Sequence, residues 1–350
     1  MKKFFVSLVM LLSTSAASVF AQSSLIATLS HDGEITAFYG ADALKEAHEA
    51  AVHGDAITLS SGSFNATNIT KAITLRGAGM QMDQVYNVMP TTLLGNFNIQ
   101  IADATTKKLT IEGIAHNLNI YIEGALDGAR FIKSRFQTIY INDNVGFQNC
   151  SFLHCKIVES LDLNGNSSCS FISSYICKCC PNGAALQFVN SILKTYAQSG
   201  DSKASLASFS SSSFYNCILV GSNTYASVYG NNSYYDKLPS SSYAYSCVAM
   251  NIYENADCFV NISNKTNYNS NFKDVFADFT GTYNDDVTFE LTDEAKSKFT
   301  GTDGTQIGLY GGSFPFDPTT SNPHITKCNV AAKSTADGKL SVDIEVAGVE

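Results

Sequence analysis

The fold is decided by residues 131–152, which read FIKSRFQTIYINDNVGFQNCSF. This stretch holds two copies of a six-residue pattern, at positions 131–136 and 147–152. The pattern is an apolar residue, any residue, a polar residue, Ser or Cys, any residue, and a large apolar residue. Repetition of this kind is typical of solenoid folds, in which each turn packs on its neighbours.

Further copies of the pattern follow along the chain. Residues 188–193 and 214–219 match it well, and residues 166–171 and 244–249 are degenerate copies. The Ser or Cys position therefore falls at residues 134, 150, 169, 191, 217 and 247, in steps of 16, 19, 22, 26 and 30 residues. Variable steps indicate coils that carry loops of different length, although 16 residues is short for a full coil.

Strand geometry explains the residue types in the pattern. Inward side chains alternate along a strand. The polar residue suits a turn, where Asn tolerates a left-handed backbone. The next residue points into a confined space, and a free Cys behaves there as a small buried hydrophobe. We therefore expect Cys150, Cys169, Cys217 and Cys247 to be stacked core residues rather than disulfides. Whether the other six cysteines are bridged is left open.

Both ends of the chain carry signals for elements that close the solenoid. Apolar residues at helical spacing predict a cap helix at about 41–53, which ends at Gly54. At the other end, Asp337-Gly338 lies between two strand-like runs, 325–332 and 339–346, and favours a hairpin. We expect a β-helix over residues 22–316 and a C-terminal hairpin or strand extension over 317–350.

The N-terminal part resembles secreted β-helix proteins of the pectin-lyase-like superfamily. The elements that carry the resemblance are Ala43-Leu44, Ala51, Gly54-Asp55, Ile57-Thr58-Leu59, Gly62-Ser63-Phe64 and residues 73–79. Residues 301–312, with Pro315, Phe316, Asp317 and Pro318 after them, resemble the last coil of uncharacterised β-helix proteins exported by anaerobic Gram-negative gut bacteria. The resemblance implies an all-β fold, namely a single-stranded right-handed parallel β-helix.

The first 21 residues have the features of a signal peptide. Lys2 and Lys3 precede a short apolar run, and small residues lead to a cleavage site between Ala21 and Gln22. We expect a secreted, periplasmic or cell-surface protein without a transmembrane segment after cleavage. The formal net charge of -9 argues against a nucleic-acid partner, which needs a basic surface. A monomer is expected.

The superfamily resemblance raises the question of polysaccharide cleavage. The polygalacturonase signature is incomplete, because Arg-x-Lys is absent and the one His-Gly is His53-Gly54 in the cap helix. A lyase needs a base, often with Ca2+ to neutralise the substrate carboxylate. The weak catalytic candidates for a lyase are Lys133, Arg135 and Asp143. The alternative interpretation is a solvated outer face. No cofactor or metal site is expected, and Ca2+ enters only with the lyase alternative.

A Tyr-rich insert separates the last two copies of the pattern. Exposed aromatic rings beside amides suit sugar stacking, and long loops often carry function. The candidate ligand-binding residues are Tyr225, Tyr229, Tyr234 and Tyr235, although a loop that packs its own Tyr residues is an equal alternative. We expect a non-catalytic exported protein that binds a polysaccharide, a cell-surface glycan or another surface partner. The alternatives are a polysaccharide lyase or glycoside hydrolase with an atypical site, and a structural or adhesive surface protein.

Overall fold

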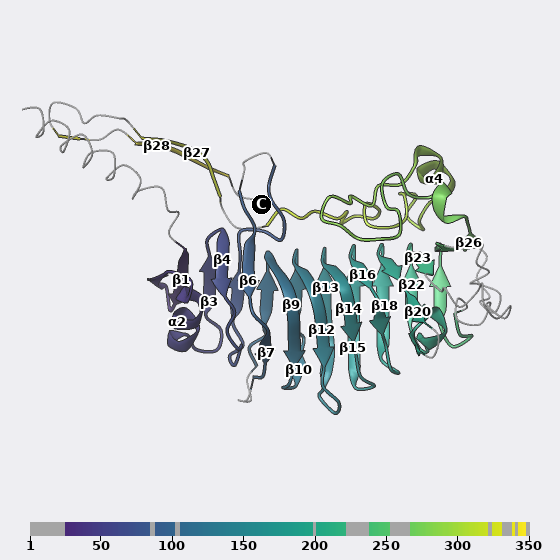
Figure 1. Ribbon diagram of the computed structural model, residues 1–350, viewed down its shortest axis with the longest axis horizontal. Helices are drawn as coiled ribbons and strands as arrows, with labels where there is room; N and C mark the ends of the chain where they lie inside the picture. Colours follow the sequence, from purple (N-terminus) through teal and green to yellow (C-terminus); the bar gives the residue numbers. More distant parts are fainter. Residues whose placement is uncertain are drawn as a thin grey trace, which may run out of the picture.

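The computed structural model describes residues 25–84, 88–101, 106–198, 201–221, 238–252, 267–320, 324–330, 338–339 and 342–347. Over these residues the predicted all-β parallel β-helix is confirmed. Two parallel sheets stack along one axis as a β-solenoid of about eight turns (Figure 1). Successive turns of the chain add strands to the two sheets, so the repeated residues line up in rows along the axis.

We call the first of these sheets sheet A. Its parallel strands are β3 (Ala56–Leu59), β5 (Thr74–Arg76), β8 (Thr110–Glu112), β11 (Arg130–Ile132), β13 (Phe147–Leu153), β15 (Ser167–Ile172), β18 (Ala185–Val189), β22 (Ser213–Tyr215) and β24 (Tyr243–Tyr245). The short strand β10 (Leu126–Asp127) also pairs with β13.

Sheet B lies on the other side of the core. Its strands are β4 (Gly62–Asn65), β6 (Thr91–Leu94), β9 (Ile114–Ile122), β12 (Arg135–Ile141), β14 (Lys156–Asp162), β16 (Tyr175–Cys177), β19 (Ile192–Lys194), β23 (Ile218–Gly221), β25 (Val248–Asn251) and β26 (Tyr268–Asn269). Strand β7 (Phe97–Ile99) also pairs with β9, and β17 (Cys179–Cys180) pairs with β14.

The N-terminal end is closed by a helix and an antiparallel hairpin. Helix α2 (Ala43–Ala50) occupies the predicted cap position and packs against the first strands. Strands β1 (Ile26–His31) and β2 (Glu34–Tyr39) extend sheet A with antiparallel pairing, which the sequence did not predict. The expected C-terminal strands are β27 (His324–Val330) and β28 (Val342–Ala347), which pair antiparallel with each other. Two smaller elements lie between β19 and β22 in the chain. They are the antiparallel strand pair β20 (Tyr196–Gln198) and β21 (Asp201–Ala204) and the 3-10 helix η1 (Leu206–Ser208).

A row of stacked phenylalanine rings runs through the core. Each ring lies 4.7–5.0 Å from the next, with interplanar angles of 7–12°, in the order Phe131, Phe152, Phe171, Phe188 and Phe214. All five side chains are fully buried. The ring spacing matches the distance between paired strands, so the row follows directly from one Phe per coil.

The register of the strands corrects the expected alignment of the repeat. Phe131 pairs with Phe152 and Phe152 with Phe171, so the true copies are residues 152–157 and 171–176, five residues later than expected. The Ser or Cys positions are therefore 134, 155, 174, 191, 217 and 247, in steps of 21, 19, 17, 26 and 30 residues. Residues 147–152 imitate the pattern because Asn149 has a left-handed backbone beside a register shift, which turns both Phe147 and Phe152 inward.

The Ser residues of this row form hydrogen bonds with the backbone inside the corner between the two sheets. The hydroxyl of Ser174 donates to the carbonyl of Ile172 at 2.9 Å and accepts the backbone N–H of Cys155 at 3.0 Å. Ser134 makes the same two kinds of contact. Cys155 thus stands where Cys150 was expected. The eight cysteines at 150, 155, 169, 177, 179, 180, 217 and 247 are free, and Cys150, Cys169, Cys217 and Cys247 are buried as predicted.

Candidate functional site

The outer face of sheet B is covered by a second hydrophobic core. Outward side chains on four successive strands are fully buried, namely Tyr175, Ile192, Ile218 and Val248. They pack beneath residues 272–300, which we call the C-terminal layer. This layer contains η3 (Phe272–Asp274) and α4 (Asp293–Lys298) and supplies the covering side chains Val275, Phe276, Phe279, Val287, Phe289, Leu291 and Phe299. A face that is usually solvated is therefore interior here.

Residues 301–320 form a strap that runs back along the turns between the sheets. The sequence predicted a last coil at 301–312, and the structure differs, because each part of this stretch bonds to the turn of an earlier coil. Thr302 contacts Asn216, Gly311 contacts Asn190, Phe314 contacts Ser173, Asp317 contacts His154 and Lys133, and Thr320 contacts Ala78. Figure 1 shows the chain returning from α4 toward the N-terminal half.

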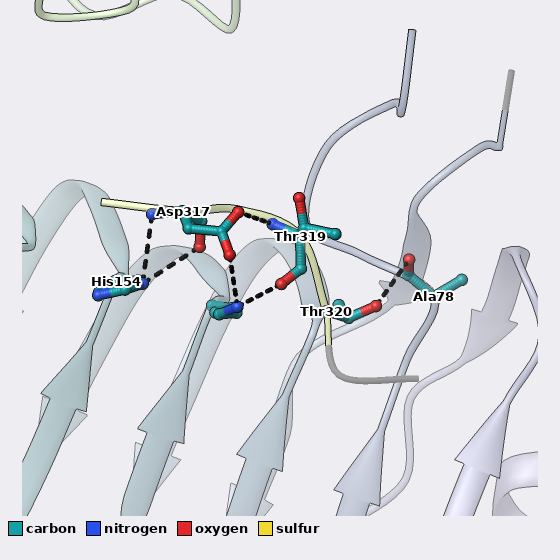
Figure 2. Close-up of polar contacts among 6 residues, drawn as sticks. Ala78, His154, Asp317, Thr319 and Thr320 are labelled. Atoms are coloured by element: carbon teal, nitrogen blue, oxygen red, sulfur yellow. Dashed lines mark hydrogen bonds and ion pairs between the residues drawn. The ribbon is translucent and has the colours of Figure 1, made fainter. Parts of the chain in front are cut away.

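The strap is held by the polar residue of the repeat. This residue has a positive φ in six coils, at Lys133, His154, Ser173, Asn190, Asn216 and Ser246, so its side chain leaves the corner of the solenoid. Figure 2 shows His154 bonded to Asp317, and Asp317 bonded to Thr319 within the strap. The Lys133 ammonium lies 2.8 Å from the Asp317 carboxylate and also donates to the carbonyl of Thr319. The close approach needs glycine at position 312, where a Cβ would lie 1.9 Å from the Asn190 amide nitrogen.

Acid should loosen this part of the strap. Burial raises the pKa of Asp317, but hydrogen bonds from Lys133 and Thr319 outweigh it and leave the pKa below its usual value. Such a carboxylate stabilises the folded strap above its unfolded pKa, and the contribution disappears as the pH falls through the folded pKa. We expect proteolysis of the strap to accelerate below about pH 4. Asp317→Asn should remove this step while Asp143→Asn, at an exposed site, keeps it. Identical profiles for the wild type and Asp317→Asn would contradict the assignment.

A cavity of about 470 Å³ lies where the C-terminal layer ends. One wall comes from residues 80–84 with Met89 and Pro90, another from residues 285–288 of the layer, and a third from the strap residues Tyr310, Phe316 and Pro318. The sheet contributes Arg135 and Lys156. These two residues are paired neighbours on β12 and β14, in the row that continues as Tyr175 and Ile192. The second hydrophobic core therefore covers the apolar residues of this row, and the cavity lies over its two charged residues, Arg135 and Lys156.

Lys156 is the most buried charged group of the cavity, with 4% of the residue exposed. Its ammonium lies 3.3 Å from the side-chain oxygen of Gln81. The rings of Tyr283, Phe289 and Phe316 surround it at 5.5–6.0 Å. Burial lowers the pKa of Lys156 to about 8, which Asp285 opposes and Arg135 reinforces. A fraction of this amine is consequently neutral in mildly alkaline solution.

Arg135 is also withdrawn from solvent, but it is paired. Its Nε lies 3.6 Å from the carboxylate of Asp285, and its guanidinium donates to the side chain of Asn117 at 2.5 Å. Asp285 accepts a further hydrogen bond from the hydroxyl of Tyr283 at 3.0 Å. This arrangement fixes the arginine against the layer and leaves the Asp285 side chain two-thirds exposed at the rim of the cavity.

The structure separates the three catalytic candidates. Lys133 holds the strap, Arg135 lines the cavity, and Asp143 is exposed in the turn that follows the far end of β12. Strand geometry puts residues 135 and 143 about 25 Å apart. Lys156 was not predicted from the sequence, although it stands as a lysine at the fifth position of the true repeat copy 152–157. Tyr225, Tyr229, Tyr234 and Tyr235 lie outside the described residues.

A second surface lies on the outer face of sheet A, and we call it the tyrosine face. It consists of Tyr215 on β22 with Tyr243 and Tyr245 on β24. The ring centroids of Tyr215 and Tyr243 are 5.5 Å apart, and those of Tyr243 and Tyr245 are 6.5 Å apart with nearly parallel planes. Tyr243 is 47% exposed.

The tyrosine face adjoins an open hollow of about 480 Å³ on the same sheet. Ser213 belongs to this hollow and pairs directly with Tyr243. The other polar groups of the hollow are hydroxyls, amides and thiols, among them Ser168, Ser170 and Gln187. Aromatic rings and uncharged hydrogen-bonding groups therefore lie side by side on an exposed surface.

Comparison with known proteins gives no match, because no protein-family model, curated protein or solved structure matches the chain. Among the described residues, no cluster of three or more His, Cys, Asp or Glu side chains is arranged to hold a metal ion. None of the helices in the described part has the length and apolar character needed to cross a bilayer.

Proposed function

We propose that this chain is an exported, non-catalytic β-helix protein that binds an uncharged glycan at the tyrosine face. The observation that carries the proposal is the exposed Tyr243 ring, flanked by Tyr215 and Tyr245 and bordered by hydroxyl and amide groups. Export and membership of the pectin-lyase-like superfamily belong to the same proposal. The charged and apolar N-terminal segment supports the first, and the motifs within residues 43–79 support the second.

The chemistry of this face suits a neutral sugar. A pyranose ring has an apolar C–H face that packs on an aromatic ring, and hydroxyls at its edge that need hydrogen-bonding partners. The tyrosine rings supply the first kind of contact, and the serine and glutamine side chains of the hollow supply the second. Because Tyr215 lies on β22 and Tyr243 and Tyr245 lie on the adjacent strand β24, the rings are spaced to contact neighbouring units of an extended oligosaccharide.

Truncation of the central ring should abolish most of the binding. We expect Tyr243→Ala to weaken the affinity for a neutral oligosaccharide by about tenfold, the effect of losing one aromatic contact of roughly 1.4 kcal/mol. The measurement is a screen of glucose-, xylose- and mannose-based oligosaccharides on an array, followed by calorimetry with the best ligand.

The matched control is Tyr39→Ala, which removes a 65% exposed tyrosine from β2 at the opposite end of sheet A. This variant should bind as the wild type does. Equal affinities for all three proteins would remove the tyrosine face from the proposal, and no binding by the wild type to any glycan would reject the function itself.

A second candidate function is a polysaccharide lyase that uses the cavity. The observation in its favour is Lys156, a buried amine with a pKa lowered to about 8 and therefore able to act as a base, with Arg135 beside it. Elimination would create an unsaturated product that absorbs ultraviolet light. If this candidate is right, Lys156→Met abolishes the absorbance increase on acidic polysaccharides, whereas Tyr243→Ala leaves it intact.

A further inference from the structure

Among the described residues, the ammonium of Lys156 has fewer acceptors than it has protons. It carries three N–H donors, and the described residues give its nitrogen one 3.3 Å hydrogen bond to Gln81 and three aromatic contacts. No described carboxylate lies within 4 Å of this nitrogen. A buried ammonium without a counter-ion is costly, so proteins pair such groups. The residue nonetheless lines a cavity large enough for a small molecule.

The acidic groups near the cavity are occupied elsewhere or lie at its rim. Asp285 pairs with Arg135 and accepts from Tyr283. Asp278 accepts both the backbone N–H and the hydroxyl of Thr288 at 2.5 Å. Asp286 is exposed. The ammonium of Lys156 is therefore available to pair with a negatively charged group of a ligand that enters the cavity.

The rest of the wall is mainly apolar. Met80, Met82 and Met89 contribute thioether side chains, and Phe316 and Val287 add apolar groups from the strap and the layer. Methionine side chains are unbranched and adapt to ligands of different shape. The wall also holds Gln81, Gln84 and Thr288, while Arg135 and Asp285 are paired with each other, so Lys156 is the charged group that faces the cavity without a described counter-ion.

We infer that the cavity is a second binding site, which takes a small apolar carboxylic acid with its carboxylate on Lys156 and its hydrocarbon part against the methionines. This site is distinct from the tyrosine face and does not depend on glycan binding. The carboxylate supplies the missing counter-charge, and the apolar tail packs against the methionines and Phe316. The acidic rim formed by Asp285 and Asp286 disfavours ligands with a second negative charge.

The test uses calorimetry with 4-phenylbutyrate and hexanoate, each compared with its uncharged primary amide. We expect the acids to bind at least tenfold more tightly than the amides. Lys156→Met keeps the length and shape of the side chain and should reduce acid binding to the level of the amides. The matched control is Lys45→Met, which removes an exposed lysine from α2. Circular dichroism and thermal melting of each variant establish that it is folded.

The pH dependence provides a second readout. Bound carboxylate favours the charged amine, so binding should take up protons near pH 8, and acid affinity should fall as the pH rises above the pKa of free Lys156. Amides that bind as tightly as the acids, or acid binding that survives Lys156→Met unchanged, would overturn the inference. Because Tyr243→Ala should leave acid binding intact, failure at one site is distinguishable from failure at the other.

Discussion

Phe171→Ala should destabilise the protein by about 3–5 kcal/mol, the usual cost of truncating a buried phenylalanine. Phe171 is fully buried and stacks on Phe152 at 5.0 Å and on Phe188 at 4.7 Å. The alanine would leave a cavity in the middle of the ring row, where the two flanking coils cannot close it without breaking their strand pairing. Urea unfolding followed by circular dichroism measures the change.

The matched control is Phe314→Ala in the strap. The Phe314 side chain is 70% exposed, and the contact that the residue makes to Ser173 uses its backbone carbonyl. We expect a change within about 0.5 kcal/mol for this surface substitution. If Phe171→Ala were as mild as Phe314→Ala, the ring row would not be the core of the solenoid.

Ile218→Asp should detach the C-terminal layer. On an uncovered solenoid this outward position would tolerate a charge, but here the side chain is fully buried beneath the layer and the strap. A Cβ on Gly308 of the strap would lie 2.7 Å from the Ile218 side chain, which shows how tightly the two surfaces meet. An unpaired carboxylate cannot remain there, because burying it would cost several kcal/mol. Limited proteolysis should cut residues 272–320 much faster in this variant.

Ser170→Asp is the control for this experiment. Ser170 points outward from sheet A and is partly exposed in the open hollow. Its substitution should leave the cleavage rate of residues 272–320 unchanged. Equal cleavage rates for Ile218→Asp and the wild type would mean that the layer does not cover sheet B.

The sequence was sufficient for the fold because the fold is a repeat of local rules. A Phe in each coil, a turn residue with a left-handed backbone and a small residue at the inner corner are visible within six residues. The error in register arose at Phe147, where a bulge at Asn149 satisfies the same local rules one strand segment too early. The true copy is identified by the pairing of Phe152 with Phe131 and Phe171. Such pairing depends on the neighbouring coils and cannot be read from six residues alone.

The candidate site was beyond the reach of the sequence because its contacts join distant parts of the chain. Lys133 and Asp317 are 184 residues apart, and Lys156 and Gln81 are 75 residues apart. Nothing near Lys133 indicates that a strap will pass over it. A lysine at an outward position of a strand is expected to be exposed to solvent. Lys156 is buried only because the C-terminal layer covers this strand. Residues 272–300 contain no sequence repeat from which the C-terminal layer could be predicted.

The proposed function is tested most directly by saturation-transfer NMR on the wild-type protein with a neutral oligosaccharide. The chain has no tryptophan, so irradiation of the aromatic region saturates its tyrosine and phenylalanine rings, and Tyr243 is the exposed centre of the tyrosine face. Binding at this face predicts strong transfer to the sugar C–H protons, transfer reduced in keeping with a tenfold weaker affinity after Tyr243→Ala, and an unchanged sugar spectrum after prolonged incubation. Undiminished transfer in Tyr243→Ala, or the appearance of cleaved sugar, would contradict a non-catalytic glycan-binding protein.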